Sequence, residues 1–264
     1  MTLELLSHFP SRPTGKTPLL FVHGAWHGAW CWEKKFLPYF ADHGYEAHAP
    51  SLCGHGGNDR TGLRWKRIDD YVEDVADATA RMDRPPVLIG HSMGGLLVQR
   101  YLERGPVPGA VLLASVPVGG IFGVMMRLAL RHPLLYLWAN ATMSLYPYIA
   151  TPELAREAFF SRDMPLEETT RLWKHLQDES YLAFLDMLLF RHARPRLAVR
   201  GGTPMLVLGA AEDRTFIPSE VRRTGAAYGV DAEIFPQMAH DMMLERGWQA
   251  VAGRILGWLG ERGL

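Results

Sequence analysis

Residues 87–99, VLIGHSMGGLLVQ, decide which fold the sequence predicts. The residues before Gly90 are aliphatic, as a buried strand prefers, and those after Gly95 place apolar side chains at helical spacing. A strand therefore runs into a helix through one short turn, with Ser92 at its tip. Glycine has no Cβ, so it lets a helix and a strand approach closely at such a turn. Residues 90–94 fit the pattern G-x-S-x-G, the nucleophile elbow, in which a strained turn exposes the serine hydroxyl above the sheet edge.

A serine at this turn becomes a nucleophile only when a base takes its proton and an acid orients that base. Around a nucleophile elbow the partners follow in the chain order serine, acid, histidine. His240 follows the expected strand at residues 231–236, in a loop before the last expected helix, which makes it the candidate base, with an exposed loop histidine as the alternative. Three other histidines follow Ser92, but no acid stands at a strand end before them: His132, His175 and His192.

The candidate acid is Asp213, which follows the apolar strand-like stretch MLVLGA in a loop of small residues. Its neighbour Glu212 is the other carboxylate of this loop, and we interpret it as a solvated side chain. Asp241 directly follows the candidate base, but adjacent side chains on an extended loop point apart. The sequence therefore predicts Ser92, Asp213 and His240 as a catalytic triad.

Attack of the serine on a carbonyl creates an oxyanion, which needs two preorganised donors. The backbone N–H of Met93 is the first candidate, because it opens the helix that follows the serine. The second is expected from the glycine-rich loop HGAWHG, with the N–H of Ala25 as our first choice and that of Trp26 next. His23 and His27 lie in the same loop, but a glycine-rich loop does not place them on one face, so we expect no metal site there.

Apolar strands and amphipathic helices alternate along most of the chain. This alternation predicts an α/β protein with a mostly parallel, doubly wound sheet that is covered on both faces. The expected strands are residues 18–22, 45–50, 86–90, 109–115, 203–210 and 231–236. The expected helices are residues 32–41, 68–82, 93–104 and 248–259.

Residues 118–200 break this alternation, because they contain helical, apolar segments and no convincing strand. We expect them to form a helical cap, or lid, over a core made of residues 1–117 and 201–264. Such a cap creates an apolar pocket above the sheet, although most of its apolar side chains serve packing. The candidate pocket residues are Trp26, Met125, Trp138, Met143, Tyr146 and Met187.

The composition is that of an ordinary globular protein, with 48% hydrophobic and 21% charged residues among 264. A formal net charge of zero gives no electrostatic reason to expect nucleic acid or an anionic membrane as a partner. We expect no transmembrane segment and no secretory signal. The two cysteines, Cys31 and Cys53, are expected as free, small side chains, which favours a cytoplasmic location. The sequence gives no indication of the oligomeric state.

The motifs together resemble the α/β-hydrolase superfamily over nearly the whole chain from residue 19. Residues 19–32, LLFVHGAWHGAWCW, are similar to the opening of plant methylesterases and hydroxynitrile lyases. GHSMGG, EDRTFIP and the late histidine fit the broader esterase and lipase branch. The resemblance implies an α/β-hydrolase fold with a helical cap inserted between core strands, and a serine hydrolase that needs no cofactor.

Two departures narrow the activity. Plant hydroxynitrile lyases carry a lysine directly after the catalytic histidine, where this chain has Asp241. Epoxide hydrolases and haloalkane dehalogenases use an aspartate nucleophile, where this chain has Ser92. We therefore predict hydrolysis of small, apolar carboxylic esters with a short- to medium-chain acyl or alcohol part. The alternatives are a C–C bond hydrolase, a lyase or a perhydrolase on the same triad, or a ligand-binding protein with little turnover.

Overall fold

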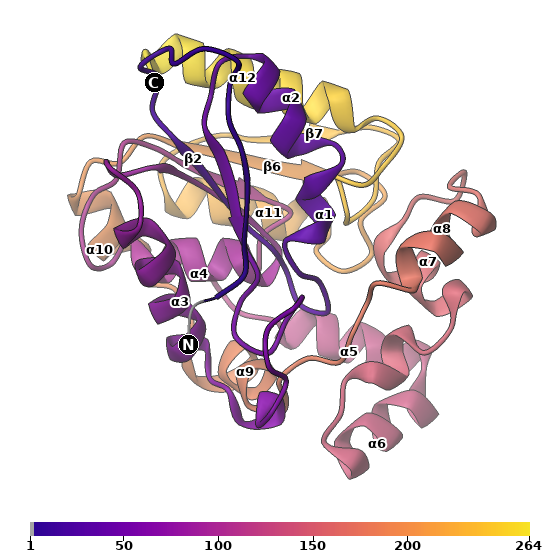
Figure 1. The fold of residues 1–264 in the computed structure, drawn as a ribbon. Helices are drawn as coiled ribbons and strands as arrows, with labels where there is room; N and C mark the ends of the chain where they lie inside the picture. Colours follow the sequence, from indigo (N-terminus) through magenta and orange to yellow (C-terminus); the bar gives the residue numbers. More distant parts are fainter. Residues whose placement is uncertain (1–2) are drawn as a thin grey trace.

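The computed structural model describes residues 3–264 and has a central seven-stranded sheet (Figure 1). The strand order is β1-β3-β2-β4-β5-β6-β7, and every neighbouring pair is parallel except β1 and β3. The strands are β1 (Leu5–His8), β2 (Leu19–Val22), β3 (Ala47–Pro50), β4 (Val87–His91), β5 (Ala110–Leu113), β6 (Met205–Ala210) and β7 (Ala232–Phe235). The sheet is therefore mostly parallel, as the alternating pattern predicted.

The central strands are short, aliphatic and buried along their whole length, whereas the two edge strands are half-buried. Continuous burial explains why β2, β5 and β6 are apolar at every position rather than at alternate ones. Val22 pairs with Gly90, and Gly90 pairs with Leu112, so the carboxyl ends of three central strands lie at the same level. The loops that leave these ends consequently meet at one edge of the sheet.

Helices cover both faces of the sheet (Figure 1). The aromatic side chains of the first two helices and the last helix pack with Phe21 on one face, and the helices on either side of β4 pack with Leu20 on the other. These helices are α1 (Trp30–Glu33), α2 (Phe36–Asp42), α3 (Ile68–Ala80), α4 (Met93–Tyr101), α11 (Pro218–Ala227) and α12 (Trp248–Arg262). A single 3-10 turn, Leu63–Trp65, precedes α3.

Two details of the helices differ from the sequence pattern. The helix expected over residues 32–41 is broken, because Lys35 leaves the helical region with φ −123° and ψ −68°. Its ammonium group donates a hydrogen bond to the carbonyl of Leu244 at 2.6 Å, a contact between segments far apart in sequence. Helix α11 was not predicted, since its segment is largely polar and has few apolar residues to show a period.

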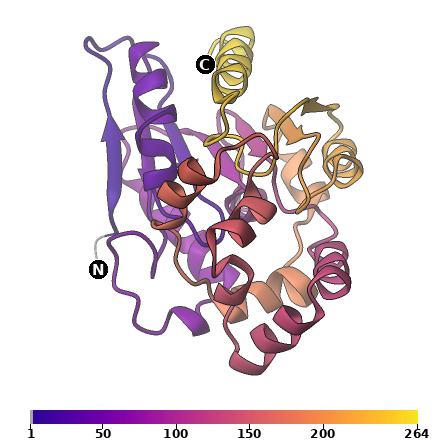
Figure 2. The ribbon, with the colours of Figure 1, turned by 90° about the vertical axis from the view of Figure 1, so that its right-hand side faces the viewer.

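The segment between β5 and β6 is a helical insertion that contains no strand among its residues, all of which the structure describes. Figure 2 shows these helices in front of the sheet. They are α5 (Phe122–Arg131), α6 (Pro133–Thr142), α7 (Pro152–Phe159), α8 (Leu166–Trp173), α9 (Tyr181–Leu185) and α10 (Pro195–Arg200), with a 3-10 turn at Tyr146–Ile149 and a π-helical turn at Asp186–Phe190. Within residues 3–264, no helix has the length and apolarity that crossing a membrane requires.

Candidate active site

Ser92 lies at the turn between β4 and α4, in a backbone conformation that side chains rarely adopt. Its φ is 53° and its ψ is −119°. The turn is tight because helix and strand nearly touch: a Cβ on Gly90 would overlap the Gly94 carbonyl, and a Cβ on Gly94 would overlap the carbonyl of Val22. The glycines of the motif are therefore required by close backbone approach, and the serine is held in its strained position by the surrounding main chain.

Three side chains from three loops form one hydrogen-bonded chain at the carboxyl edge of the sheet. The Ser92 hydroxyl lies 2.9 Å from Nε2 of His240, and Nδ1 of His240 lies 2.8 Å from Oδ2 of Asp213. His240 comes from the loop between β7 and α12, and Asp213 from the loop between β6 and α11. All three side chains are buried. The structure thus brings together the three residues that the sequence singled out.

The acid of this chain is fixed by backbone donors. The other carboxylate oxygen of Asp213, Oδ1, accepts hydrogen bonds from the N–H groups of Thr215 at 2.7 Å and Phe216 at 2.9 Å. Burial alone would disfavour a charged imidazole, but the charge and the hydrogen bond of Asp213 outweigh it and raise the pKa of His240. The imidazole is therefore a stronger base than an ordinary histidine.

Two backbone N–H groups next to Ser92 are free to receive negative charge. Within the described residues, the N–H groups of Met93 and Ala25 have no hydrogen-bond acceptor, and both residues line the same cavity as Ser92. The N–H of Trp26, the other candidate from this loop, instead donates to Oε2 of Glu179 at 3.3 Å. The structure therefore favours Ala25 over Trp26 as the second donor.

Further histidines support the site without entering it. Nε2 of His91 donates to the carbonyl oxygen of His240 at 3.0 Å, which fixes the loop of the candidate base. Burial, aided by the neighbouring His240 ring, lowers the pKa of His91 to about 3, so this ring is neutral near pH 7. His23 donates to the Gly24 carbonyl at 2.8 Å and accepts the N–H of Leu52 at 3.0 Å.

Asp241 is a supporting residue that the sequence did not reveal. It is buried and its Oδ2 lies 3.0 Å from Nε2 of His27, whose Nδ1 lies 2.7 Å from the Ala25 carbonyl. Burial raises the pKa of Asp241 and the facing His27 ring lowers it, and the pKa lies below its ordinary value as a result. This pair connects the loop of His240 to the loop of Ala25.

A metal could be considered only at one cluster of the described residues. Polar atoms of His91, His240 and Asp241 lie within 4.8 Å of one another. However, Nε2 of His240 already contacts Ser92, and its Nδ1 contacts Asp213. Nε2 of His91 contacts the carbonyl oxygen of His240. These contacts fit side chains that form a hydrogen-bond network better than side chains that bind a metal.

Above Ser92 lies a cavity of about 630 Å³ between the sheet edge and the helical insertion. Three of the predicted pocket residues line it: Trp26, Met125 and Met187. The other three do not line it and are partly exposed: Trp138 at 54%, Met143 at 38% and Tyr146 at 38%. The reason is that α6 and its flanks are apolar on every side, so their composition cannot show which side faces inward. Pocket residues that the sequence did not single out include Leu128, Leu135, Tyr148, Phe159 and Phe184.

The sequence is similar to that of proteins in one large family. A family model described as "Alpha/beta hydrolase family" matches residues 19–254. The pyrethroid hydrolase of Sphingobium wenxiniae is 32% identical over 102 residues, 38% of this chain and 36% of that protein. Methylesterase 18 of Arabidopsis thaliana is 26% identical over 189 residues, 64% of this chain and 70% of that protein.

Solved structures add a likeness of fold over the whole chain. The monoacylglycerol lipase of Paleococcus ferrophilus superposes with a TM-score of 0.69 at 21% identity, covering 99% of this chain and 100% of that one. The sequence match between this chain and the pyrethroid hydrolase spans well under half the length of that hydrolase.

Proposed function

The chain belongs to the α/β-hydrolase family, and we propose that it hydrolyses carboxylic esters through an acyl-enzyme on Ser92. The observation that carries the proposal is the continuous hydrogen-bonded chain from Ser92 through His240 to Asp213, at the floor of an apolar cavity. A hydroxyl, a base with a raised pKa and an orienting carboxylate are the parts that acyl transfer to water requires.

In the first half of the reaction, Nε2 of His240 takes the Ser92 proton while Oγ attacks the ester carbonyl carbon. The carbonyl oxygen becomes an oxyanion, which the N–H groups of Ala25 and Met93 stabilise. Asp213 stabilises the imidazolium and keeps Nδ1 as the protonated nitrogen. The tetrahedral intermediate then collapses, and His240 gives its proton to the departing alcohol.

In the second half, water replaces the alcohol. His240 takes a proton from this water as its oxygen attacks the acyl carbon, and the same two N–H groups stabilise the second oxyanion. Collapse breaks the bond to Oγ, and Ser92 recovers its proton from the imidazolium. The carboxylic acid leaves as the second product, and no cofactor enters either half.

The cavity supports an apolar substrate. Its walls are mainly aliphatic and aromatic, with charged side chains such as Arg127, Arg131 and Glu157 among the lining residues contributed by the insertion. We propose that residues 118–200 act as a cap over a core formed by residues 1–117 and 201–264, and that the cap binds a short- to medium-chain acyl or alcohol part. A small ester is the proposed partner, and the cytoplasm is the proposed location.

A panel of p-nitrophenyl esters from acetate to dodecanoate tests this proposal. We expect turnover with an optimum at a short or medium chain, and loss of at least about a thousandfold in kcat for Ser92→Ala. A β-diketone, a cyanohydrin and peracid formation from peroxide are assayed beside the esters. Ester turnover that is negligible in the wild-type chain, or turnover confined to one of the other substrates, would contradict the proposal.

A further inference from the structure

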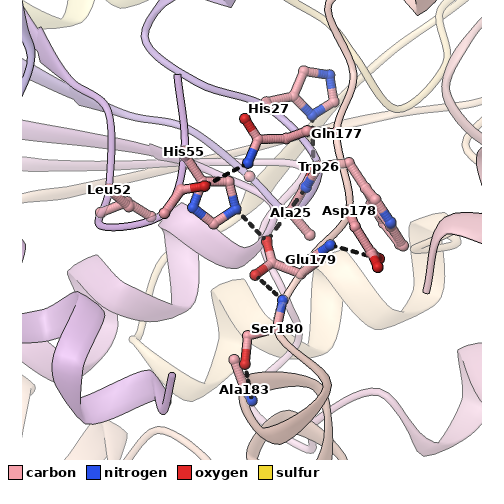
Figure 3. A network of polar contacts seen from close by, with 12 residues as sticks. Ala25, Trp26, His27, Leu52, His55, Gln177, Asp178, Glu179, Ser180 and Ala183 are labelled. Carbon is pink, nitrogen blue, oxygen red and sulfur yellow. Dashed lines mark hydrogen bonds and ion pairs between the residues drawn. The ribbon is translucent and has the colours of Figure 1, made fainter. Parts of the chain in front are cut away.

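A buried carboxylate in the helical insertion contacts the loop of Ala25, although neither the triad nor the cavity contains it. Glu179 is 1% exposed and lies in the segment that leads into α9. Its Oε1 accepts hydrogen bonds from the Tyr71 hydroxyl at 2.9 Å and the Ser180 N–H at 2.6 Å. Its Oε2 accepts from Nε2 of His55 at 3.0 Å and from the N–H of Trp26 at 3.3 Å (Figure 3). Each oxygen of the carboxylate therefore accepts two hydrogen bonds.

The charge of Glu179 is balanced inside the protein by His55. The two side chains are both buried, and the other ring nitrogen of His55 faces the carbonyl oxygen of Cys53 at 3.2 Å. Burial opposes charge on both groups, but their mutual attraction and hydrogen bonds raise the pKa of His55 and lower the pKa of Glu179. The acceptor that faces Trp26 is thus an ionised carboxylate, which forms stronger hydrogen bonds than a neutral amide.

The backbone of Trp26 is held from both sides by this segment. Its N–H donates to Glu179, and its carbonyl accepts the N–H of Gln177 at 3.1 Å. Trp26 has a φ of 65°, a conformation that a bulky residue adopts only when its surroundings hold it there. The peptide group that joins Ala25 to Trp26 is also held on its carbonyl side, by Nδ1 of His27.

The segment that carries Glu179 is itself fixed to the core. The Gln177 side chain donates to the Gly54 carbonyl at 2.7 Å and accepts the Gly56 N–H at 3.1 Å. The Ser180 hydroxyl lies 2.5 Å from the Lys66 carbonyl. Figure 3 shows Gln177, Glu179 and Ser180 on one continuous segment of the chain, which faces His55 and Trp26. The carboxylate therefore offers Trp26 an acceptor at a fixed position.

We propose that Glu179 is a positioning residue for the oxyanion hole: it holds the strained Trp26 peptide so that the N–H of Ala25 stays free and directed at the cavity beside Ser92. This inference rests on the proposed ester hydrolysis. Without the carboxylate, the Trp26 N–H loses its acceptor inside the protein, and the turn relaxes toward an ordinary φ. The adjacent Ala25 N–H then leaves the position from which it stabilises the transition state.

Glu179→Gln tests the proposal, because the amide keeps the size of the side chain but places an NH₂ group among four donors. We expect kcat for a medium-chain p-nitrophenyl ester to fall about 10- to 100-fold, with KM changed less than about threefold. A trifluoromethyl ketone forms an adduct with Ser92 that places an oxyanion in the hole, so its affinity should weaken by a similar factor. A folded variant with unchanged kcat and unchanged ketone affinity overturns the proposal.

Tyr71→Phe is the matched control, since it removes a hydrogen bond to the same carboxylate without touching the Trp26 contact. We expect kcat to stay within about threefold of the wild-type value. An equal loss in both variants would assign the effect to general damage and overturn the proposal.

Two measurements keep the test valid if Glu179→Gln does not fold. Glu179→Asp keeps a negative charge in this segment but retracts it by one methylene from its partners, the Trp26 N–H included, and should show the same loss of kcat; an unchanged kcat overturns the proposal. In the unmodified chain, the Trp26 amide should exchange with solvent far more slowly than an exposed loop amide; fast exchange overturns the proposal. A wild-type chain without ester turnover would refute the proposed function instead, whatever Glu179 does.

Discussion

At the scale of single residues, the site depends on the hydrogen bond between the Asp213 carboxylate and the imidazole of His240. The carboxylate accepts from Nδ1 at 2.8 Å and is itself fixed by two backbone N–H groups. One ring nitrogen is thereby set as a donor, and the other is left to accept the proton of Ser92. The raised pKa of His240 follows from the same contact, because the negative charge outweighs the effect of burial.

Asp213→Asn should reduce kcat by about three to four orders of magnitude, because the amide stabilises no imidazolium and permits the wrong tautomer. Steady-state hydrolysis of a p-nitrophenyl ester measures the loss. Glu212→Gln, on the exposed neighbouring residue, should leave kcat within about twofold of wild type. If both substitutions had the same effect, Asp213 would not be the acid.

The pH dependence of hydrolysis follows from the direction of one pKa shift. Only neutral His240 can accept the Ser92 proton, so kcat/KM should fall as the pH drops through its pKa, with an acid limb above the ordinary histidine value of 6.5. His91, with its pKa lowered to about 3, should add no limb in this range. The profile of residual activity in Asp213→Asn should shift to lower pH, and a shift to higher pH would contradict the assignment.

At the scale of elements, the junction of β4 and α4 determines whether the serine is presented at all. A Cβ on Gly94 would overlap the carbonyls of Val22 and His23, whereas a Cβ on Gly105 would meet nothing within 4 Å. We expect Gly94→Ala to lower the free energy of unfolding by about 1–3 kcal/mol, as overpacking does, and to move α4 away from β2. Denaturant titration measures this loss, and Gly105→Ala, the control, should show little of it. Equal stability of the two variants would mean that the turn has room to spare.

The elements also show how far the sequence could lead. Strands and helices near Ser92 follow from apolar runs and periodicity, which are local signals, and they lie where the pattern predicted. Three features depend instead on residues that folding brings together: the break at Lys35, the pair of His27 and Asp241, and the contact of Glu179 with Trp26. The residues of the last two pairs are 214 and 153 positions apart in the sequence. No local pattern records such contacts, so the sequence indicated the candidate triad but not the residues that hold it in place.

At the scale of the whole molecule, the parallel sheet places the carboxyl ends of its central strands at one edge, where loops from distant parts of the chain meet. The α/β-hydrolase fold predicted from the motifs is confirmed by the family match and by the observed sheet. The insertion between β5 and β6 contributes the apolar wall of the cavity. Met125 and Met187 of the insertion line the cavity as predicted, whereas Trp138 is exposed, because the apolar composition of α6 does not show which of its sides faces inward.

The size of the cavity should set the preferred chain length of the substrate. Met125 lines the cavity, whereas the next residue on α5, Met126, does not line it and is 46% exposed. Met125→Trp should lower kcat/KM for octanoate and longer esters about tenfold while sparing acetate, because it fills part of the cavity. Met126→Trp should leave the chain-length profile unchanged. A profile that shifts equally in both variants would place the acyl chain elsewhere.

In the proposed mechanism, Ser92 forms a covalent bond to the group that it attacks. Mass spectrometry after treatment with a fluorophosphonate measures this directly, because the reagent phosphonylates an activated serine and stays attached. We predict one adduct per chain, located on the peptide that contains Ser92, formed much more slowly in His240→Ala and absent in Ser92→Ala. An unlabelled wild-type chain, or a label on another residue that persists in Ser92→Ala, would contradict the role of Ser92 as the nucleophile.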